Sequence, residues 1–413
     1  MQIRNLGSSG LRVSAVGLGC NNFGQRTDLE TSRKVIHKAI DLGITLFDTA
    51  DIYAGMGGSE TVLGTVLGDR RKDIVLATKY AKPMATDGTK QGASRRYIMS
   101  AVEASLKRLK TDYIDLYQQH DYDPLTPIDE TLRALDDLVR QGKVRYIGHS
   151  NFPAWRIAEA EYVARAMNVN RFVSCQDEYS LLVRDIEKDL LPAAMEYNLG
   201  LLPFFPLASG LLTGKYQRGT AAPADTRFAK APALKDRYAT PRNEDIVEKL
   251  QAFAGARGHT MLELAFSWLA ARPQVSSVIA GATRVADQRV LRLKRTETYE
   301  QVGAHLMGTG LQTFVAKSVE DGETGRDEDV LPSRSREQEH LKCGPCAPAC
   351  GSNRSTFSSQ NSRRRTVSAS SVSNSSRVSV AARWAMRLKP SFRPIWSWSR
   401  WPARLPAPSI GRR

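Results

Sequence analysis

Acidic residues are missing from the last part of the chain. Residues 343–413 contain 13 Lys and Arg and no Asp or Glu, whereas residues 1–342 hold 46 basic and 43 acidic side chains. The formal net charge of +16 therefore falls to +3 for residues 1–342. Because the main body is nearly neutral, its composition shows no basic surface of the kind that binds nucleic acid, and we predict no specific nucleic-acid partner.

Cysteines and long apolar runs are also scarce. Two of the five Cys, Cys20 and Cys175, stand in apolar contexts, so we predict buried free thiols and no disulfide framework. The N-terminus has no apolar signal core, and the most apolar stretch, 199–212, is too short and too interrupted to span a bilayer. We therefore predict a soluble, cytoplasmic protein without a membrane partner.

Short apolar runs alternate with amphipathic stretches as far as residue 284. The runs predicted as strands are 13–19, 45–48, 74–79, 114–120, 144–150, 172–179, 200–207 and 276–282. The stretches predicted as helices are 29–42, 59–68, 94–109, 127–141, 153–168, 185–198 and 260–271, with an extra helix near 244–256. This alternation predicts parallel strands joined by right-handed crossovers.

Two architectures fit that pattern, an open doubly wound sheet and a closed (β/α)8 TIM barrel. Polar side chains follow six of the predicted strands, which favours the barrel, because its functional face draws on all the strand ends. An open sheet would concentrate them at one switch point. A long segment rich in Ala, Pro and Arg, 215–245, is predicted to be a lid or binding loop.

Four polar residues at or just after the ends of predicted strands suggest an active site: Asp48, Tyr53, Lys79 and His120. A carboxylate, a phenol, an ammonium and an imidazole at the ends of neighbouring parallel strands can meet in one pocket. Such a set suits the protonation of an oxygen while a hydride reaches the adjacent carbon. The alternative is an Asp48–Lys79 salt bridge beside a Tyr and a His that only pack.

Two other nucleotide-enzyme signatures are weak or missing. The glycines of 17–24 follow a strand, but the third Gly comes late and no helix starts at once, so they match the dinucleotide fingerprint poorly. The Tyr-x-x-x-Lys pair of short-chain dehydrogenases is absent from the chain.

Several motifs in order resemble the aldo-keto reductase superfamily over residues 3–284. They are Leu46-Phe47-Asp48-Thr49-Ala50-Asp51-Ile52-Tyr53, Ala77-Thr78-Lys79, Gly142-Lys143-Val144-Arg145-Tyr146-Ile147-Gly148, His149-Ser150-Asn151-Phe152 and the run from Pro206 to Tyr216. The resemblance implies a (β/α)8 barrel that reduces an aldehyde or ketone to an alcohol with NADPH.

The resemblance also implies roles for the four residues. Tyr53 would be the general acid, and Lys79 would stabilise its phenolate and lower its pKa from about 10 toward the working range. Asp48 would hold Lys79, and His120 would orient the carbonyl.

Cofactor contacts are implied for matching positions. Ser150, Asn151 and Gln176 would hold the nicotinamide carboxamide, and Phe204 stands where the family often stacks a Tyr. Arg284 offers a planar fork for a 2′-phosphate, so NADPH is expected rather than NADH. The remaining expected cofactor residues are Leu207, Ser209, Gly210, Leu211, Lys215, Gly281 and Thr283.

The resemblance fades after Arg284. The stretch 285–291 does not carry the adenine contacts of the family's eighth helix, and the sequence beyond is rich in Ser, Arg and Pro. We assign 1–296 to the barrel and 297–413 to a basic, disordered extension, either a separate segment or the product of a shifted reading frame. The group His340, Cys343, Cys346 and Cys350 has a zinc-like spacing, but chance spacing is preferred and no metal is predicted.

Three functions stay open from the sequence. The first is the carbonyl reductase, acting on a small molecule that the sequence does not identify. The second is a regulatory or redox-sensing subunit on the same fold, like the β subunits of potassium channels. The third is an inactive product of a damaged reading frame. The oligomeric state is not predicted.

Overall fold

The computed structural model describes residues 1–285. Several expectations lie outside these residues: all but the first residue of the altered eighth helix at 285–296, the domain boundary after 296, the disordered extension and the His340/Cys343/Cys346/Cys350 group.

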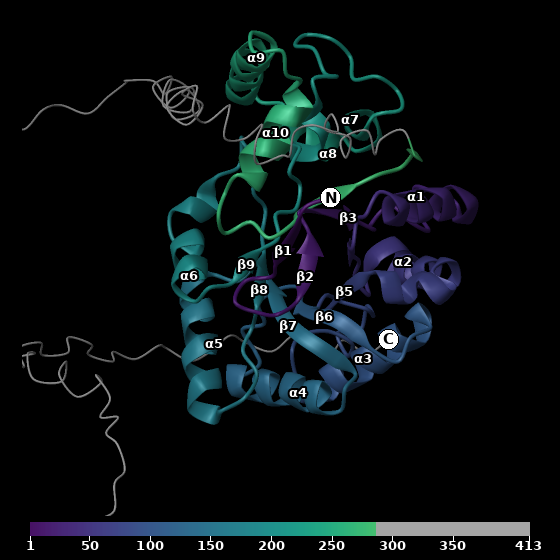
Figure 1. Ribbon diagram of the computed structural model, residues 1–413, viewed down its shortest axis with the longest axis vertical. Coiled ribbons are helices and arrows are strands. Elements are labelled where there is room, and N and C mark those ends of the chain that lie inside the picture. The colour runs from purple at the N-terminus through teal and green to yellow at the C-terminus, as the bar shows by residue number, and fades with distance from the viewer. Residues whose placement is uncertain (286–413) are drawn as a thin grey trace, which may run out of the picture. The chain divides into compact units, whose positions relative to one another are not determined.

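Eight parallel strands form the barrel in the order β10-β3-β4-β5-β6-β7-β8-β9 (Figure 1). A parallel bridge between Leu201 and Val275 and a hydrogen bond from Ile279 N to Pro203 O (3.1 Å) join the two outer strands. The barrel predicted from the sequence is thus confirmed. Its strands are β3 (Val16–Gly19), β4 (Leu46–Asp48), β5 (Val75–Tyr80), β6 (Ile114–Gln119), β7 (Val144–Ser150), β8 (Ser174–Gln176), β9 (Gly200–Leu201) and β10 (Val278–Gly281).

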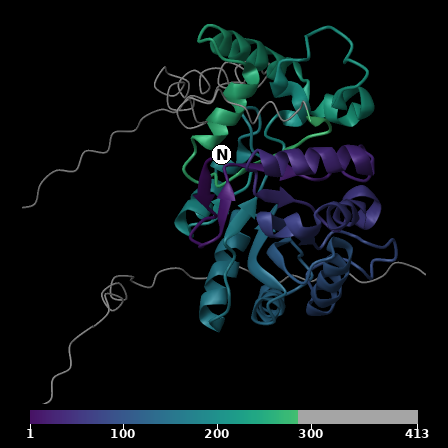
Figure 2. The same cartoon turned by 45° about the vertical axis from the view of Figure 1, so that its right-hand side comes forward.

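A helix on the outside follows each of the first seven barrel strands. These helices are α1 (Leu29–Asp41), α2 (Tyr53–Val66), α3 (Arg95–Leu109), α4 (Ile128–Arg140), α5 (Ala154–Met167), α6 (Leu190–Glu196) and α10 (Met261–Ala270). In both views α1, α2 and α3 follow one another along the outside of the sheet (Figures 1 and 2).

The long connection after β9 contains additional short helices, which the sequence analysis did not anticipate before residue 244. They gather beside α10 at the top of Figure 1. The elements of this connection are η3 (Ala208–Thr213), α7 (Arg227–Lys230), α8 (Pro232–Tyr238) and α9 (Pro241–Gly255). Two further 3-10 helices lie elsewhere in the chain, η1 (Gly68–Asp73) before β5 and η2 (Asp185–Glu187) after β8.

Local sequence explains where several helices begin. Asp28 accepts a hydrogen bond from Thr31 N (2.7 Å) at the start of α1. Thr260 and Glu263 form a reciprocal capping box at the start of α10. In α4, Leu132, Leu135 and Leu138 recur at helical spacing and are fully buried, so that face packs on the barrel.

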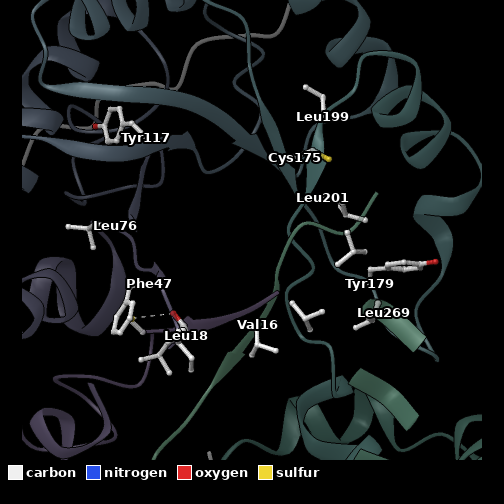
Figure 3. Close-up of a cluster of buried hydrophobic side chains, with 14 of the residues drawn as sticks. Val16, Leu18, Phe47, Leu76, Tyr117, Cys175, Tyr179, Leu199, Leu201 and Leu269 are labelled. Atoms are coloured by element: carbon white, nitrogen blue, oxygen red, sulfur yellow. Dashed lines mark hydrogen bonds between the residues drawn. The ribbon is translucent and has the colours of Figure 1, made fainter. Parts of the chain in front are cut away.

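The apolar core has two layers, inside and outside the barrel wall. The outer layer lies between strands and helices, and Figure 3 shows part of it, with Val16, Phe47, Leu76 and Tyr117 from four strands and Leu269 from α10. The inner layer takes one side chain from each of several strands and two from the N-terminal hairpin: Leu46, Ala77, Leu116, Leu202, Ile279, Leu6 and Val13.

Two strand predictions differ from the structure. The run 13–19 is divided, because β2 (Arg12–Ser14) pairs antiparallel with β1 (Ile3–Asn5) before β3 begins at Val16. The run 200–207 forms only the two-residue β9, since Pro203 and Pro206 lack the N–H that a ladder needs. Within residues 1–285, no helix combines the length and apolar character needed to cross a membrane.

Candidate active site

A polar layer lies inside the barrel just beyond its apolar inner layer. Side chains two residues apart on a strand point the same way, so the positions two after Leu46, Ala77 and Leu116 also face inward. Together with the ends of β7 and β8, these positions hold Asp48, Lys79, Gln118, Ser150 and Gln176. The strand period alone therefore converts an apolar interior into a polar site at the carboxyl end of the barrel.

Asp48, Lys79 and Tyr53 form a connected chain. Lys79 is fully buried, and its Nζ lies 2.7 Å from Asp48 Oδ2 and 2.9 Å from the Thr49 carbonyl oxygen. The same ammonium lies 3.5 Å from the Tyr53 hydroxyl. A buried cation is thus shared between a carboxylate and a phenol, which is the arrangement that stabilises a phenolate.

His120 lies beside the phenol. Its ring centroid is 5.7 Å from that of Tyr53, at an interplanar angle of 84°. Burial, together with the charges of Lys79 and Lys82, lowers the pKa of His120 to about 2. The imidazole is therefore neutral at ordinary pH and offers one N–H donor and one acceptor rather than two donors.

The electrostatic balance at Tyr53 differs from the expectation. Burial raises the pKa of Tyr53, and the nearby Lys79 cation lowers it by less than burial raises it. The net shift is upward because a phenolate in a dry site loses its hydration, so the phenol keeps its proton at neutral pH. At Lys79, burial disfavours the charge, but Asp48 and Tyr53 outweigh it and raise the pKa of the ammonium.

Two glutamines hold Asp48 from its other side. Gln176 Nε2 lies 2.9 Å and Gln118 Nε2 lies 3.2 Å from Asp48 Oδ1. Sequence reasoning placed Gln176 in the cofactor site and missed Gln118. The only available signal was the period of two along β6, which puts Gln118 on the same face as His120.

A cavity of about 1350 Å³ opens over this layer. That volume exceeds the roughly 300–1,000 Å³ of an ordinary ligand pocket, so a dinucleotide and a small substrate fit the available space. The predicted site residues that line it are Asp48, Tyr53, His120, Ser150, Asn151, Gln176, Phe204, Leu207, Ser209, Gly210, Lys215, Gly281, Thr283 and Arg284.

Two predicted site residues do not line the cavity. Lys79 lies behind Asp48 and Tyr53, where it contacts both. Leu211 is 4% exposed and packs in the outer apolar core, so the structure does not bring it to the cavity.

The end of the cavity formed by η3 has features that fit a dinucleotide phosphate. Ala208, Ser209 and Gly210 all have positive φ, and the buried Ser209 Oγ has no hydrogen-bond partner in the described residues. A Cβ on Gly210 would lie 3.3 Å from Lys215 Nζ, so glycine lets the ammonium come close to the backbone.

Two arginines that the sequence analysis missed also line the cavity, Arg26 and Arg227. Neither makes an ion pair with a described acid, and burial together with the Arg26 charge lowers the pKa of Arg227. Two neighbouring guanidinium groups in the wall of the cavity, which Asp225 also lines, favour a bound anion. Nothing in the sequence distinguishes Arg227 from Arg218 of the same segment, which pairs with Asp245 at 2.5 Å. In the described part of the chain, no cluster of metal-ligating side chains occurs.

The chain is similar in sequence to several known proteins. The sequence model of the Aldo/keto reductase family matches residues 15–289. The chain is 38% identical over 298 residues to a probable voltage-gated potassium channel subunit beta of Arabidopsis thaliana, covering 69% of this chain and 88% of that protein. It is 38% identical over 299 residues to the uncharacterized oxidoreductase YrpG of Bacillus subtilis (strain 168), covering 70% and 89%. It is 34% identical over 335 residues to L-glyceraldehyde 3-phosphate reductase of Escherichia coli (strain K12), covering 77% and 96%.

Proposed function

Since the chain belongs to the aldo/keto reductase family, we propose that it reduces an aldehyde or ketone to an alcohol with NADPH. The observation that carries the proposal is the chain from buried Asp48 and Lys79 to Tyr53, which lines a large cavity beside His120. A salt bridge that only stabilises the fold could form at the surface, and Lys is almost never fully buried unless it is paired. The full burial of Lys79 between Asp48 and Tyr53 therefore favours a functional role.

The site residues divide the chemistry between them. NADPH, when bound, supplies the hydride. Tyr53 holds a proton at neutral pH and gives it to the carbonyl oxygen, and the adjacent Lys79 stabilises the phenolate that remains. The neutral His120 donates a hydrogen bond that orients the carbonyl. Both donors lie in the wall of the cavity, and a bound cofactor and substrate would exclude water there and strengthen these interactions.

The cofactor residues of this proposal follow the length of the cavity. Ser150, Asn151 and Gln176 hold the nicotinamide end, beside Phe204. Lys215 and Arg227 neutralise the diphosphate. At the far end Thr283 and Arg284 line the cavity, where Arg284 would favour the 2′-phosphate of NADPH.

We predict that the purified full-length protein binds NADPH more tightly than NADH and reduces a simple aromatic aldehyde such as 4-nitrobenzaldehyde. Tyr53→Phe should keep NADPH binding and lower kcat by about 10²- to 10⁴-fold, because it removes the proton donor alone. Nucleotide binding is followed by fluorescence and turnover by NADPH absorbance.

Tyr80→Phe is the matched control. Tyr80 is fully buried, stacks on Tyr117 (ring centroids 4.8 Å apart) and does not line the cavity. Equal activity losses in the two variants would show that loss of a buried hydroxyl, rather than of a proton donor, explains the effect.

A regulatory role is the second candidate, supported by the 38% identity to a protein named as a probable potassium channel β subunit. Tight NADPH binding without measurable turnover of any carbonyl would favour that role. Failure to bind either nucleotide would contradict both candidates.

A further inference from the structure

Gln118 occupies the centre of the barrel without touching the cavity. It lies on β6, is 0% exposed, and stands two residues before His120. Its neighbour in register on β7 is Gly148. A Cβ at Gly148 would come within 3.3 Å of Gln118 Cγ and 2.3 Å of Ser174 Oγ, so a glycine there leaves room for the Gln118 side chain.

The hydrogen-bond chemistry sets the orientation of two amides. Asp48 Oδ1 only accepts, so the Gln118 and Gln176 atoms at 3.2 and 2.9 Å from it are their NH₂ groups. Gln176 Nε2 also lies 3.4 Å from Gln118 Oε1. Gln118 thus accepts from Gln176 with its oxygen while it donates to Asp48 with its nitrogen.

This arrangement leaves the side-chain carbonyl oxygen of Gln176 available to accept a hydrogen bond from a ligand in the cavity. Gln176 lines the cavity, and its amide nitrogen contacts the buried Asp48 and Gln118. A carbonyl oxygen at that place accepts from the NH₂ of a nicotinamide carboxamide. The flipped amide would present a donor there and leave Asp48 Oδ1 facing an oxygen, which is repulsive.

We propose that Gln118 is a positioning residue of the reduction, an inference that rests on the proposed function. It acts in two directions through its side-chain amide. Toward the proton donor, it holds Asp48 so that Oδ2 keeps Lys79 beside Tyr53 (2.7 and 3.5 Å). Toward the cofactor, it keeps the acceptor side of Gln176 turned to the nicotinamide.

The test compares Gln118→Met with Gln119→Met in the full-length protein. Gln119 is the next residue of β6, is 2% exposed, and donates instead to the Asp121 carbonyl oxygen at 2.9 Å. Both changes remove one buried amide of the same size from the same strand. Melting temperature, the Kd for NADPH by fluorescence, and kcat/KM for 4-nitrobenzaldehyde are measured for each.

Gln118→Met should lower kcat/KM by about 10- to 100-fold, because the proton donor Tyr53 and the nicotinamide lose their alignment. It should also weaken NADPH binding by about 3- to 10-fold, the loss expected for one misoriented hydrogen bond. Gln119→Met should change neither quantity by more than about 2-fold, which is the background for a buried substitution outside the site.

Gln118→Glu is a second variant, whose side chain has the shape of the wild-type Gln, in case the Met variant folds poorly. Its carboxyl group donates to Asp48 only while protonated, so kcat/KM should acquire a descending limb at a lower pH than the loss of activity that ionisation of Tyr53 causes in the wild type. A merely structural Gln118 would lower activity at every pH without that new limb.

The outcomes separate this inference from the proposed function. A wild-type protein that binds NADPH and reduces the aldehyde, with Gln118 variants that match the Gln119 control, overturns the inference alone. A wild-type protein that neither binds nor reduces overturns the proposed function, and this inference with it.

Discussion

Two buried histidines show how position decides the use of one residue type. His120 lines the cavity, while His149, one residue before Ser150, is fully buried and does not. His149 stacks on Phe152 (ring centroids 4.5 Å apart) and meets Phe172 edge-on at 5.2 Å. Neither of its ring nitrogens has a partner in the described residues, so it packs as an aromatic ring.

We predict that His149→Phe stabilises the protein. Burial lowers the pKa of His149 to about 3, so the unfolded chain binds a proton that the folded chain refuses. The stability this site contributes is complete above about pH 6.5 and is lost as pH falls toward 3. Removing two unpaired polar atoms should add about 1–3 kcal/mol to the free energy of unfolding, with a larger gain at pH 5 than at pH 7.5.

Urea unfolding at the two pH values measures this prediction. A loss of stability that is the same at both pH values would mean that the imidazole nitrogens are satisfied and that the Phe ring is too large for the site.

At the scale of elements, left-handed backbone marks where helices begin and end. Four residues after Tyr53 have positive φ in a row, Ala54, Gly55, Met56 and Gly57, before α2 becomes regular. Such residues cost about 1–2 kcal/mol each unless they are glycine, and they cluster at functional sites. Here they separate the proposed proton donor from its helix, so Tyr53 is directed by the turn and by Lys79.

The end of α3 offers a clean test of the same rule. Lys110 caps this helix with φ 51, in the left-handed region. We predict that Lys110→Gly raises the free energy of unfolding by about 0.5–1 kcal/mol, because glycine adopts this conformation without strain.

Lys107→Gly, one turn earlier in α3, is its matched control. Lys107 is equally exposed but helical, so glycine should destabilise it by about 1 kcal/mol. Chemical unfolding of both variants decides the matter, and a loss of stability in both would contradict the strain argument.

At the scale of the whole molecule, two buried acids set part of the response to pH. Burial, reinforced by Glu60, raises the pKa of Asp51 to about 7, and burial raises that of Asp177 to about 7. Asp177 Oδ2 has no hydrogen-bond partner in the described residues. The folded state holds these two protons more tightly than the unfolded state. Their contribution to the free energy of unfolding is therefore complete below about pH 4 and is lost as pH rises through 7.

We therefore predict that the Asp51→Asn/Asp177→Asn double variant gains stability relative to the wild type as pH rises from about 4 to 8. The amide cannot ionise, so the variant avoids the cost of two buried charges. Melting temperatures across this range measure the effect, and Asp236→Asn, at an exposed acid of α8, serves as the control. A constant difference between variant and wild type would contradict the prediction.

Local pattern determined much of the fold and part of the candidate site. Alternating apolar runs and amphipathic stretches predicted the order of strands and helices, because their periods depend on neighbours in the chain. Parallel strands bring their carboxyl ends to one face, so Asp48, Lys79, His120 and Gln176 could be expected together without coordinates. The ionisable carboxylate, ammonium and imidazole among these side chains then suggested proton transfer.

Tertiary structure alone decided what depends on distant contacts. It placed Gln118 against Asp48 and Gln119 away from it, buried Leu211 in the outer core, and brought Arg26 and Arg227 to one cavity from segments some two hundred residues apart. It also reversed the expected pKa shift of Tyr53. The physical reason is the same in each case: burial and charge pairing are set by the summed packing of remote segments, which no local period encodes.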